Sequence, residues 1–191
     1  MQRNESLIRL RNLLISMAVF AALVFYASRY AEPVLRVSVM PDQPPPVLRR
    51  KLKPLTDYLE QRVGIRMEFR PMLNGDALVD GLLGHQLDLV RLDDTYLARA
   101  QVRSNGRVIA LVQREEPFDD GSEAIAAPGD YTWAVRADMD ANLREKLTDA
   151  FLSLSRNSNP GRDILDLQQA RRFIPARAER RPLLQADPAQ P

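Results

Sequence analysis

Paired carboxylates are the side chains of this sequence whose chemistry first points to a possible site. Carboxylate oxygens are the ligands that Ca²⁺ and Mg²⁺ prefer, so neighbouring acidic residues are candidates for a metal centre. The spacing of these pairs matches no calcium-binding loop, and we interpret them as helix caps and loop charges. We predict no metal and no cofactor. The pairs are Asp93 with Asp94, Glu115 with Glu116, and Asp119 with Asp120.

The other chemistry-bearing residues do not form a catalytic set. The single histidine, His85, lies in the turn-like stretch GHQLD, and the chain has no cysteine. A nucleophile needs a base within hydrogen-bonding reach, and thiolate catalysis or cysteine-bound zinc requires the residue that is missing. The sequence also lacks a glycine-rich phosphate loop. We therefore predict that the protein is not an enzyme.

The charge balance argues against nucleic acid as a partner. The 191 residues include 27 Lys and Arg against 25 Asp and Glu, which gives a formal net charge of +2. Nucleic-acid-binding domains concentrate a larger basic excess on one face. A short basic run, Arg49, Arg50, Lys51 and Lys53, is typical of a solvated helix face, with contact to anionic lipid or an acidic partner as the alternative.

The amino-terminal segment predicts a membrane anchor. Residues 1–12 carry three arginines, and residues 13–28 contain no charged side chain. The apolar run approaches the length of a transmembrane helix, and small residues are missing at the positions that a signal peptidase requires. Because positive charges resist translocation, we predict a signal-anchor over residues 13–30, with residues 1–12 in the cytoplasm and the rest in the periplasm. A cleaved signal peptide is the alternative.

Beyond a linker over residues 31–34, stretches typical of strands alternate with stretches typical of helices. Alternating or short apolar runs predict strands, and apolar residues spaced by three or four predict helices. This order favours an α/β domain with helices on both faces of a mixed, largely parallel sheet of about five strands. The predicted strands are residues 35–40, 65–70, 87–92, 107–113 and 131–135.

Local signals predict where the first helices begin and end. The helix after the first strand is expected to end at Gly64, and Pro54 within it is expected to kink or restart it. Asn74 is the predicted cap of the next helix, because its side-chain oxygen can accept a hydrogen bond from a free backbone N–H.

The last third of the domain is predicted to be helical. Asp138 or Asp140 caps one helix, and Asn159 caps another that has Pro160 at its first position. The domain is expected to span residues 35–176, and a polar tail follows it over residues 177–191.

Five stretches of this domain carry a family resemblance. In chain order they read VSVMPD, LKPLTDYLEQRVGI, ALVDGLLGHQLDLVRL, TWAVRADMDANLREKLTDAFLSL and GRDILDLQQARRFIPA. Together they resemble the periplasmic substrate-binding proteins of phosphate, phosphite and phosphonate ABC transporters. The resemblance implies a type II periplasmic-binding fold, in which two lobes close on a ligand. Where that family has a complete second lobe, this chain has only REEPFDDGSEAIAAPGD, so we predict a single lobe preceded by one transmembrane helix.

The resemblance also places a ligand-facing surface at the carboxyl ends of the strands. After the third strand, relatives have an aromatic residue and a small loop, and this chain has Arg91 to Asp94 instead. Carboxylates at a helix amino terminus occupy its free N–H groups and repel phosphate, which a lone Arg91 would have to offset. We predict that this face contacts a protein partner. Its predicted residues are Met40, Pro41, Asp42, Arg91, Leu92, Asp93, Asp94, Tyr96 and Phe118.

These features predict a single-pass inner-membrane protein with a binding-protein-like domain in the periplasm. Its predicted role is that of an accessory or sensory subunit that binds protein subunits of an inner-membrane complex. The alternative is the substrate-binding component of a phosphate, phosphite or phosphonate ABC transporter, with a small phosphate-like anion as ligand. In that alternative, a second copy or a partner chain supplies the missing lobe.

Overall fold

The computed structural model describes residues 16, 17, 19, 20, 33–115 and 131–176. The chain divides into two compact units, Met1–Pro33 and Val34–Pro191. Most of the predicted anchor, the polar tail and Phe118 lie outside the described residues. None of the helices within the described ranges is long and apolar enough to cross a membrane.

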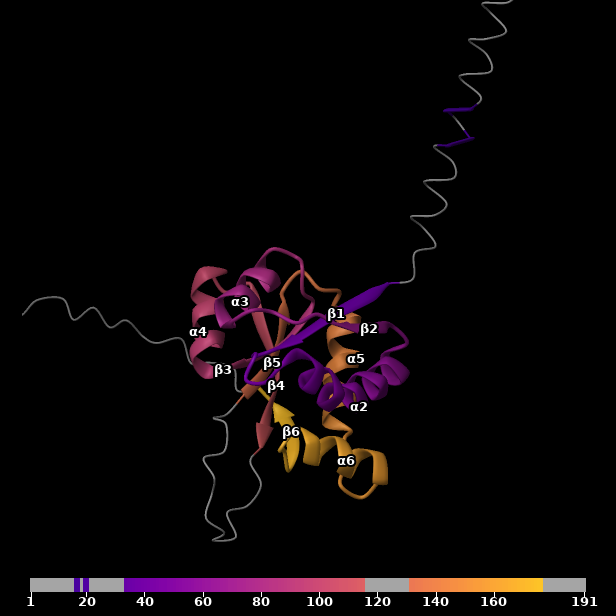
Figure 1. The fold of residues 1–191 in the computed structure, drawn as a ribbon, viewed down its shortest axis with the longest axis vertical. Helices are drawn as coiled ribbons and strands as arrows, with labels where there is room; N and C mark the ends of the chain where they lie inside the picture. Colours follow the sequence, from indigo (N-terminus) through magenta and orange to yellow (C-terminus); the bar gives the residue numbers. More distant parts are fainter. Residues whose placement is uncertain (1–15, 18, 21–32, 116–130, 177–191) are drawn as a thin grey trace, which may run out of the picture. The chain divides into compact units, whose positions relative to one another are not determined.

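The second unit is built on a mixed sheet (Figure 1). Within the described residues the sheet has six strands in the order β2-β1-β3-β5-β4-β6. β1 runs parallel to β2 and β3, whereas β5 is antiparallel to β3 and β4, and β6 is antiparallel to β4. The strands are β1 Val34–Val39, β2 Arg66–Phe69, β3 Leu89–Asp93, β4 Val108–Glu115, β5 Tyr131–Arg136 and β6 Arg172–Pro175.

The sheet differs from the prediction in its last strand and in its directions. The expectation that the last third is helical is wrong at β6, which pairs Phe173 with Arg114 and Ile174 with Gln113. Its four residues, RFIP, are too short to show an alternation in the sequence, and only Phe173 is fully buried. The parallel half of the sheet is limited to β2, β1 and β3, so the sheet is mixed rather than largely parallel.

The helices agree with the predicted order. Asn74 caps α3 as expected, its Oδ1 accepting a hydrogen bond from the N–H of Ala77 at 2.8 Å. Asp140, the second of the two predicted alternatives, caps α5 by accepting from the N–H of Leu143 at 2.9 Å. The helices are α2 Pro45–Val63, α3 Gly75–Leu83, α4 Asp94–Arg103, α5 Ala141–Leu152 and α6 Asn159–Leu167.

Two local predictions need correction. The helix α2 is continuous through Pro54 and does not restart there, and Gly64 ends it in the left-handed conformation at φ 75°. The cap of α6 is Ser158 rather than Asn159, because the Ser158 Oγ accepts from the N–H of Gly161 at 3.2 Å. A serine one position earlier satisfies the same free N–H group, so the sequence signal was shifted by one residue.

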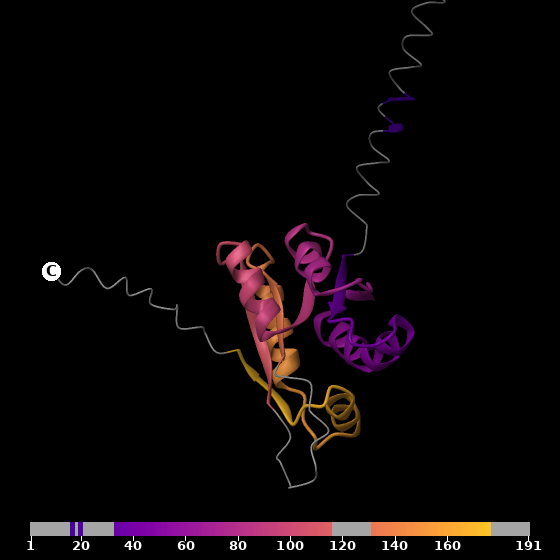
Figure 2. The same cartoon turned by 60° about the vertical axis from the view of Figure 1, so that its left-hand side comes forward.

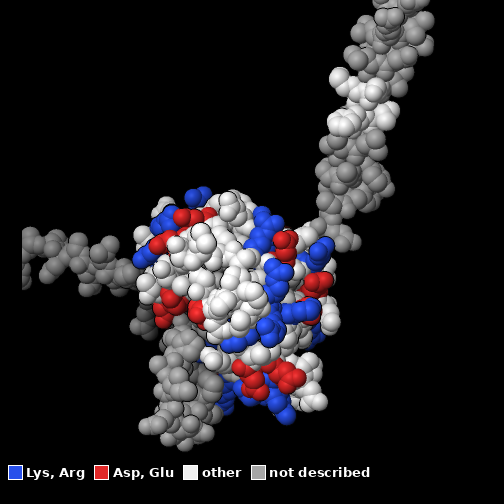
Figure 3. Space-filling view, in the orientation of Figure 1, with Lys and Arg blue, Asp and Glu red and all other residues white. Residues whose placement is uncertain are grey.

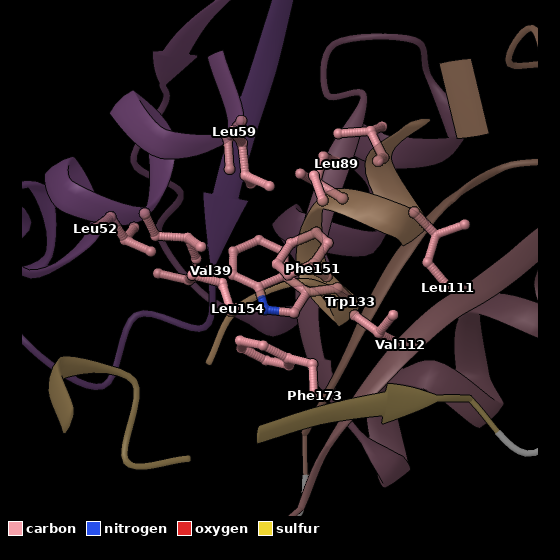
Figure 4. Packing of buried hydrophobic residues seen from close by; sticks show 14 of the residues in the cluster. Val39, Leu52, Leu59, Leu89, Leu111, Val112, Trp133, Phe151, Leu154 and Phe173 are labelled. Carbon is pink, nitrogen blue, oxygen red and sulfur yellow. The ribbon is translucent and has the colours of Figure 1, made fainter. Parts of the chain in front are cut away.

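Helices cover both faces of the sheet, as predicted (Figures 1 and 2). On one face α2, α5 and α6 enclose the larger core, which includes Leu52, Trp133 and Phe151. The ring centroids of Trp133 and Phe151 lie 5.4 Å apart, and Figure 4 shows Phe173 from β6 beside them. On the other face α3 and α4 pack a smaller core against β3, β5 and Val108 of β4. The strands are therefore buried on both sides at the centre of the sheet.

Candidate functional site

The carboxyl ends of β1 and β3 bring together residues that are distant in the sequence. Open α/β sheets bind ligands at this edge, just beyond the ends of their parallel strands. Val39 of β1 pairs in register with Arg91 of β3, so the loop that leaves β1 passes beside Arg91. As a result, the Asp42 Oδ2 lies 3.9 Å from the Arg91 Nη2.

Arg91 carries a largely buried charge that has only weak partners. Its side chain is 15% exposed, and among the described residues Asp42, at 3.9 Å, is its nearest carboxylate. The Oε1 of Gln168 accepts a long hydrogen bond of 3.4 Å from the Arg91 Nη1. Burial lowers the pKa of Arg91 from its ordinary value, although the neighbouring Tyr131 and Asp42 oppose that change. Within the described ranges the guanidinium is thus desolvated without a close counter-ion.

Tyr131 and Gln168 hold the Arg91 side chain in place. The Arg91 guanidinium lies 4.8 Å from the Tyr131 ring centroid, and the Arg114 guanidinium lies 5.1 Å from the same centroid. The Tyr131 hydroxyl donates to the Gln168 backbone carbonyl at 2.7 Å, and the Gln168 Nε2 donates to the Lys51 carbonyl at 3.4 Å. Burial raises the pKa of Tyr131 to about 12, so its hydroxyl stays protonated as a donor. The network joins α2, β3, β5 and the end of α6.

The helix amino termini at this edge offer few free N–H groups. The α2 helix begins with Pro44 at its cap and Pro45 and Pro46 in its first turn, and proline has no N–H. The next two N–H groups, of Val47 and Leu48, both donate to the Pro44 carbonyl. The backbone at the start of α2 is therefore closed to an anion.

The start of α4 is occupied by carboxylates. Asp93 caps it, its Oδ1 accepting from the N–H of Tyr96 at 2.8 Å, and Asp94 lies in its first turn. This confirms the predicted capping role for Asp93. A carboxylate in this position fills the place that a phosphate takes at an open helix end. Positive charge for a ligand at this edge comes from Arg91 and not from helix ends.

Sequence and structure comparisons show which known proteins this chain resembles. Residues 37–130 match the family model described as the periplasmic substrate-binding protein of phosphonate ABC transporters. The match confirms the predicted resemblance to this family. Because the matched family consists of substrate-binding proteins, the match also bears out the prediction that the protein is not an enzyme. No curated protein matches the chain significantly by sequence.

Solved structures share the fold at low sequence identity. PhnD1 from Prochlorococcus marinus in complex with methylphosphonate is 14% identical, with 76% of this chain and 93% of that chain covered and a TM-score of 0.62. A binding protein component of a phosphonate ABC transporter from Pseudomonas aeruginosa is 8% identical, with 76% and 82% covered and a TM-score of 0.61. XAC2383 from Xanthomonas citri, bound to chloride, is 13% identical, with 75% and 91% covered and a TM-score of 0.58.

The residues predicted for the partner surface do not all lie on one surface in the structure. Asp42, Arg91 and Asp93 lie at the sheet edge, with Met40 and Pro41 half-buried beside them and Asp94 exposed. Leu92 has no exposed surface, because alternation along β3 turns it into the core under α3 and α4, away from Arg91. Leu92 is therefore not part of the predicted partner surface.

Tyr96 also has a packing role. Its ring lies so close to Gly75 that a Cβ at that position would clash, and the Arg99 guanidinium lies 5.0 Å from its centroid. Phe118 lies outside the described residues. Sequence reasoning missed Tyr131 and Gln168, whose contacts with Arg91 span 40 and 77 residues; only the position of Tyr131 at the start of a strand gave a signal. The described residues contain no cluster of three or more side chains able to hold a metal ion.

Proposed function

We propose that the chain is the periplasmic binding component for a small phosphate-type oxyanion in an ABC transporter. The observation that carries this proposal is Arg91, a guanidinium 15% exposed at the ligand edge of the sheet with its nearest described carboxylate 3.9 Å away. A desolvated guanidinium gains most from an anion that reaches it, because a planar fork can donate two parallel hydrogen bonds to one oxyanion. The family match over residues 37–130 supports the same ligand class.

The proposed site is half of an enclosure. Small-ligand sites bury most of their ligand between preorganised groups, and one sheet edge supplies only one wall. The second wall comes, in this proposal, from a second copy of the chain or from a partner chain. The anchor predicted over residues 13–30 would hold both walls at the periplasmic surface of the inner membrane. This would raise the effective concentration of the binding site near the permease.

A second candidate function is the accessory role, in which the domain binds a protein subunit of an inner-membrane complex. Its support is the closure of the helix ends, by Pro44 to Pro46 in α2 and by Asp93 in α4. Figure 3 also shows an uncharged region on this face of the domain. Leu73, just before α3, is 93% exposed. Rigid prolines and exposed apolar side chains lose little entropy when a protein covers them.

A titration of the full chain in detergent micelles tests the first proposal. Methylphosphonate, phosphite and phosphate are titrated calorimetrically into wild type, Arg91→Gln and Arg99→Gln. Arg99 is exposed on α4 and serves as the matched arginine control. Saturable binding that Arg91→Gln weakens at least tenfold, and that Arg99→Gln leaves unchanged, supports the receptor role.

Absence of binding by wild type contradicts the receptor role. In that case the accessory role is tested by extraction of the chain from native membranes. A subunit that co-purifies with wild type, and is lost after Leu73→Asp, would support the accessory role.

A further inference from the structure

A second basic site lies at the other end of the sheet from Arg91. We propose that this distal pocket, of about 270 Å³, binds a small molecule through a phosphate group. It lies where α3 and α4 end and where β4 begins and β5 ends. The residues that carry the proposal are His85, Arg103, Arg107, Arg136 and Asp138.

The lining of the distal pocket has an excess of positive charge. Three guanidiniums face it and only one carboxylate, that of Asp138, belongs to the lining. Two of the guanidiniums are already paired: Arg136 with Asp88 and Asp138, and Arg103 with Asp80 at 2.5 Å. A paired guanidinium still has N–H donors left over, since it carries five.

Arg107 is the main donor in this proposal. Its Nε donates to the Ser104 carbonyl at 3.0 Å, and no carboxylate within the described part of the chain forms an ion pair with it. That bond fixes the direction of the guanidinium and leaves its two terminal nitrogens for a ligand. Two terminal N–H groups side by side match the spacing of two oxygens of one phosphate.

The backbone around Arg107 is rigid, so the donors are preorganised. The carbonyl of Arg107 accepts from the N–H of Ala137 at 2.8 Å, which ties the start of β4 to the end of β5. On the opposite wall, His85 follows α3 in the left-handed conformation at φ 58°. Arg136 is fixed by Asp88 and by the carbonyl of Leu87. Preorganised donors increase affinity because less side-chain freedom is lost on binding.

The distal pocket is separate from the Arg91 edge. In the β3–β5 ladder, Tyr131 pairs with Asp93 at one end and Val135 pairs with Leu89 at the other, one residue before Arg136. Strands rise about 3.3 Å per residue, so the two sites lie more than about 10 Å apart along the sheet. The inference therefore does not depend on the proposed function of the Arg91 edge.

The experiment is a calorimetric titration of inorganic phosphate into the full chain in detergent micelles. The Arg91→Gln variant serves as the background, so that any binding at the sheet edge is reduced. We expect saturable binding to remain, and we expect Arg107→Gln added to this background to weaken it at least tenfold.

A matched pair of variants separates ligand binding from loss of an ion pair. Arg103 and Arg99 both lie on α4 and each forms a 2.5 Å ion pair with a carboxylate of α3, Asp80 and Asp76 respectively, but only Arg103 lines the distal pocket. We expect Arg103→Gln to weaken phosphate binding several-fold and Arg99→Gln to leave it unchanged. The proposal is overturned if the Arg91→Gln background binds no phosphate, or if Arg107→Gln binds it as tightly as its background.

Discussion

Two charged residues three positions apart, Asp88 just before β3 and Arg91 within it, differ in how well their buried charges are compensated. The Asp88 Oδ2 accepts from the backbone N–H and the Nε of Arg36 at 2.9 and 2.7 Å, and its Oδ1 accepts from the Arg36 Nη2 at 2.9 Å. Arg136 adds a second cation at 3.4 Å. Arg91, by contrast, has among the described residues a hydrogen bond of 3.4 Å to Gln168, a carboxylate at 3.9 Å and the Tyr131 ring at 4.8 Å.

In our proposal, the difference distinguishes a charge that is compensated within the fold from one that is available to a ligand. A buried charge whose hydrogen bonds are all made is compensated within the fold and gains little from a further ion, and removing one of its partners is strongly destabilising. A buried charge with long, sparse contacts has been desolvated without full compensation, and an incoming ion of opposite sign supplies what is missing. The following predictions test this comparison, beginning with the largest expected effect.

Replacing Asp88 with Asn should destabilise the fold most. The change leaves two guanidiniums facing each other without their shared carboxylate, and removing one partner of a buried pair typically costs about 3 kcal/mol or more. Urea unfolding of the full chain followed by tryptophan fluorescence measures it. The control is Asp138→Asn, at an exposed ion pair, for which we expect a loss of at most about 1 kcal/mol. Equal losses in the two variants would contradict the structural role of Asp88.

The stabilising effect of Asp88 should disappear in acid. Burial alone raises the pKa of Asp88, but hydrogen bonds from Arg36 and the charges of Arg36 and Arg136 outweigh burial, so the net effect lowers the pKa. A carboxyl with a lower pKa when folded contributes stability above its unfolded pKa, and that contribution is lost as the pH falls through the folded pKa.

Unfolding curves recorded from neutral pH down through the acid range check this sign. The difference in unfolding free energy between wild type and Asp88→Asn should be largest near neutral pH and should shrink as the pH is lowered below about 4. A difference that stays constant across this range would show that Asp88 is not the titrating group.

The change Gln168→Glu should make the Arg91 end resemble the Asp88 end. It places a carboxylate beside the Arg91 guanidinium in a side chain of the same shape, which should raise the unfolding free energy by about 1 kcal/mol. For the same reason it should weaken phosphate-type binding at this edge, because the guanidinium is then compensated. Thermal unfolding and calorimetric titration measure the two effects. If Gln168→Glu lowers the unfolding free energy, the Arg91 guanidinium does not lack a counter-ion in the wild type.

The smallest effect is expected from Asp93→Asn. Asparagine caps a helix as well as aspartate does, so the unfolding free energy should change by less than about 0.5 kcal/mol. Removing one negative charge from the edge beside Arg91 should raise its affinity for phosphate about two- to threefold, and more at low salt. Titrations at two salt concentrations check this. If the affinity for phosphate is unchanged at both salt concentrations, Asp93 does not contribute to the site.

Features set by neighbours in the sequence could be predicted, and features set by distant pairing could not. The cap at Asn74 and the helix end at Gly64 depend on a few adjacent residues, and the structure has both where the sequence placed them. The strand β6 forms because it pairs with β4, and no residue within RFIP predicts that pairing. Local patterns carry information about local hydrogen bonds, whereas sheet partners depend on the whole chain.

The candidate site shows the same division. Arg91 was found because the family resemblance places the end of the third strand at the ligand-facing surface. Leu92 was assigned to the same surface, although alternate residues of a strand face opposite sides. Gln168 lies at the end of α6, and nothing in the sequence QQA relates it to a residue 77 positions earlier. Its role becomes visible only when α6 is packed against α2, which brings Gln168 beside Arg91.

The adjacency of β4 and β5 has a consequence for how this protein architecture evolves. Gln113 and Thr132 are paired neighbours in the sheet, so the two ends of whatever joins these strands are held together by the sheet itself. Loop closure becomes harder only logarithmically, and an eightfold longer connection costs about 2 kcal/mol. A single insertion or deletion event in the gene at this point can therefore add or remove an entire module, while the lobe on either side of the junction keeps its folded form.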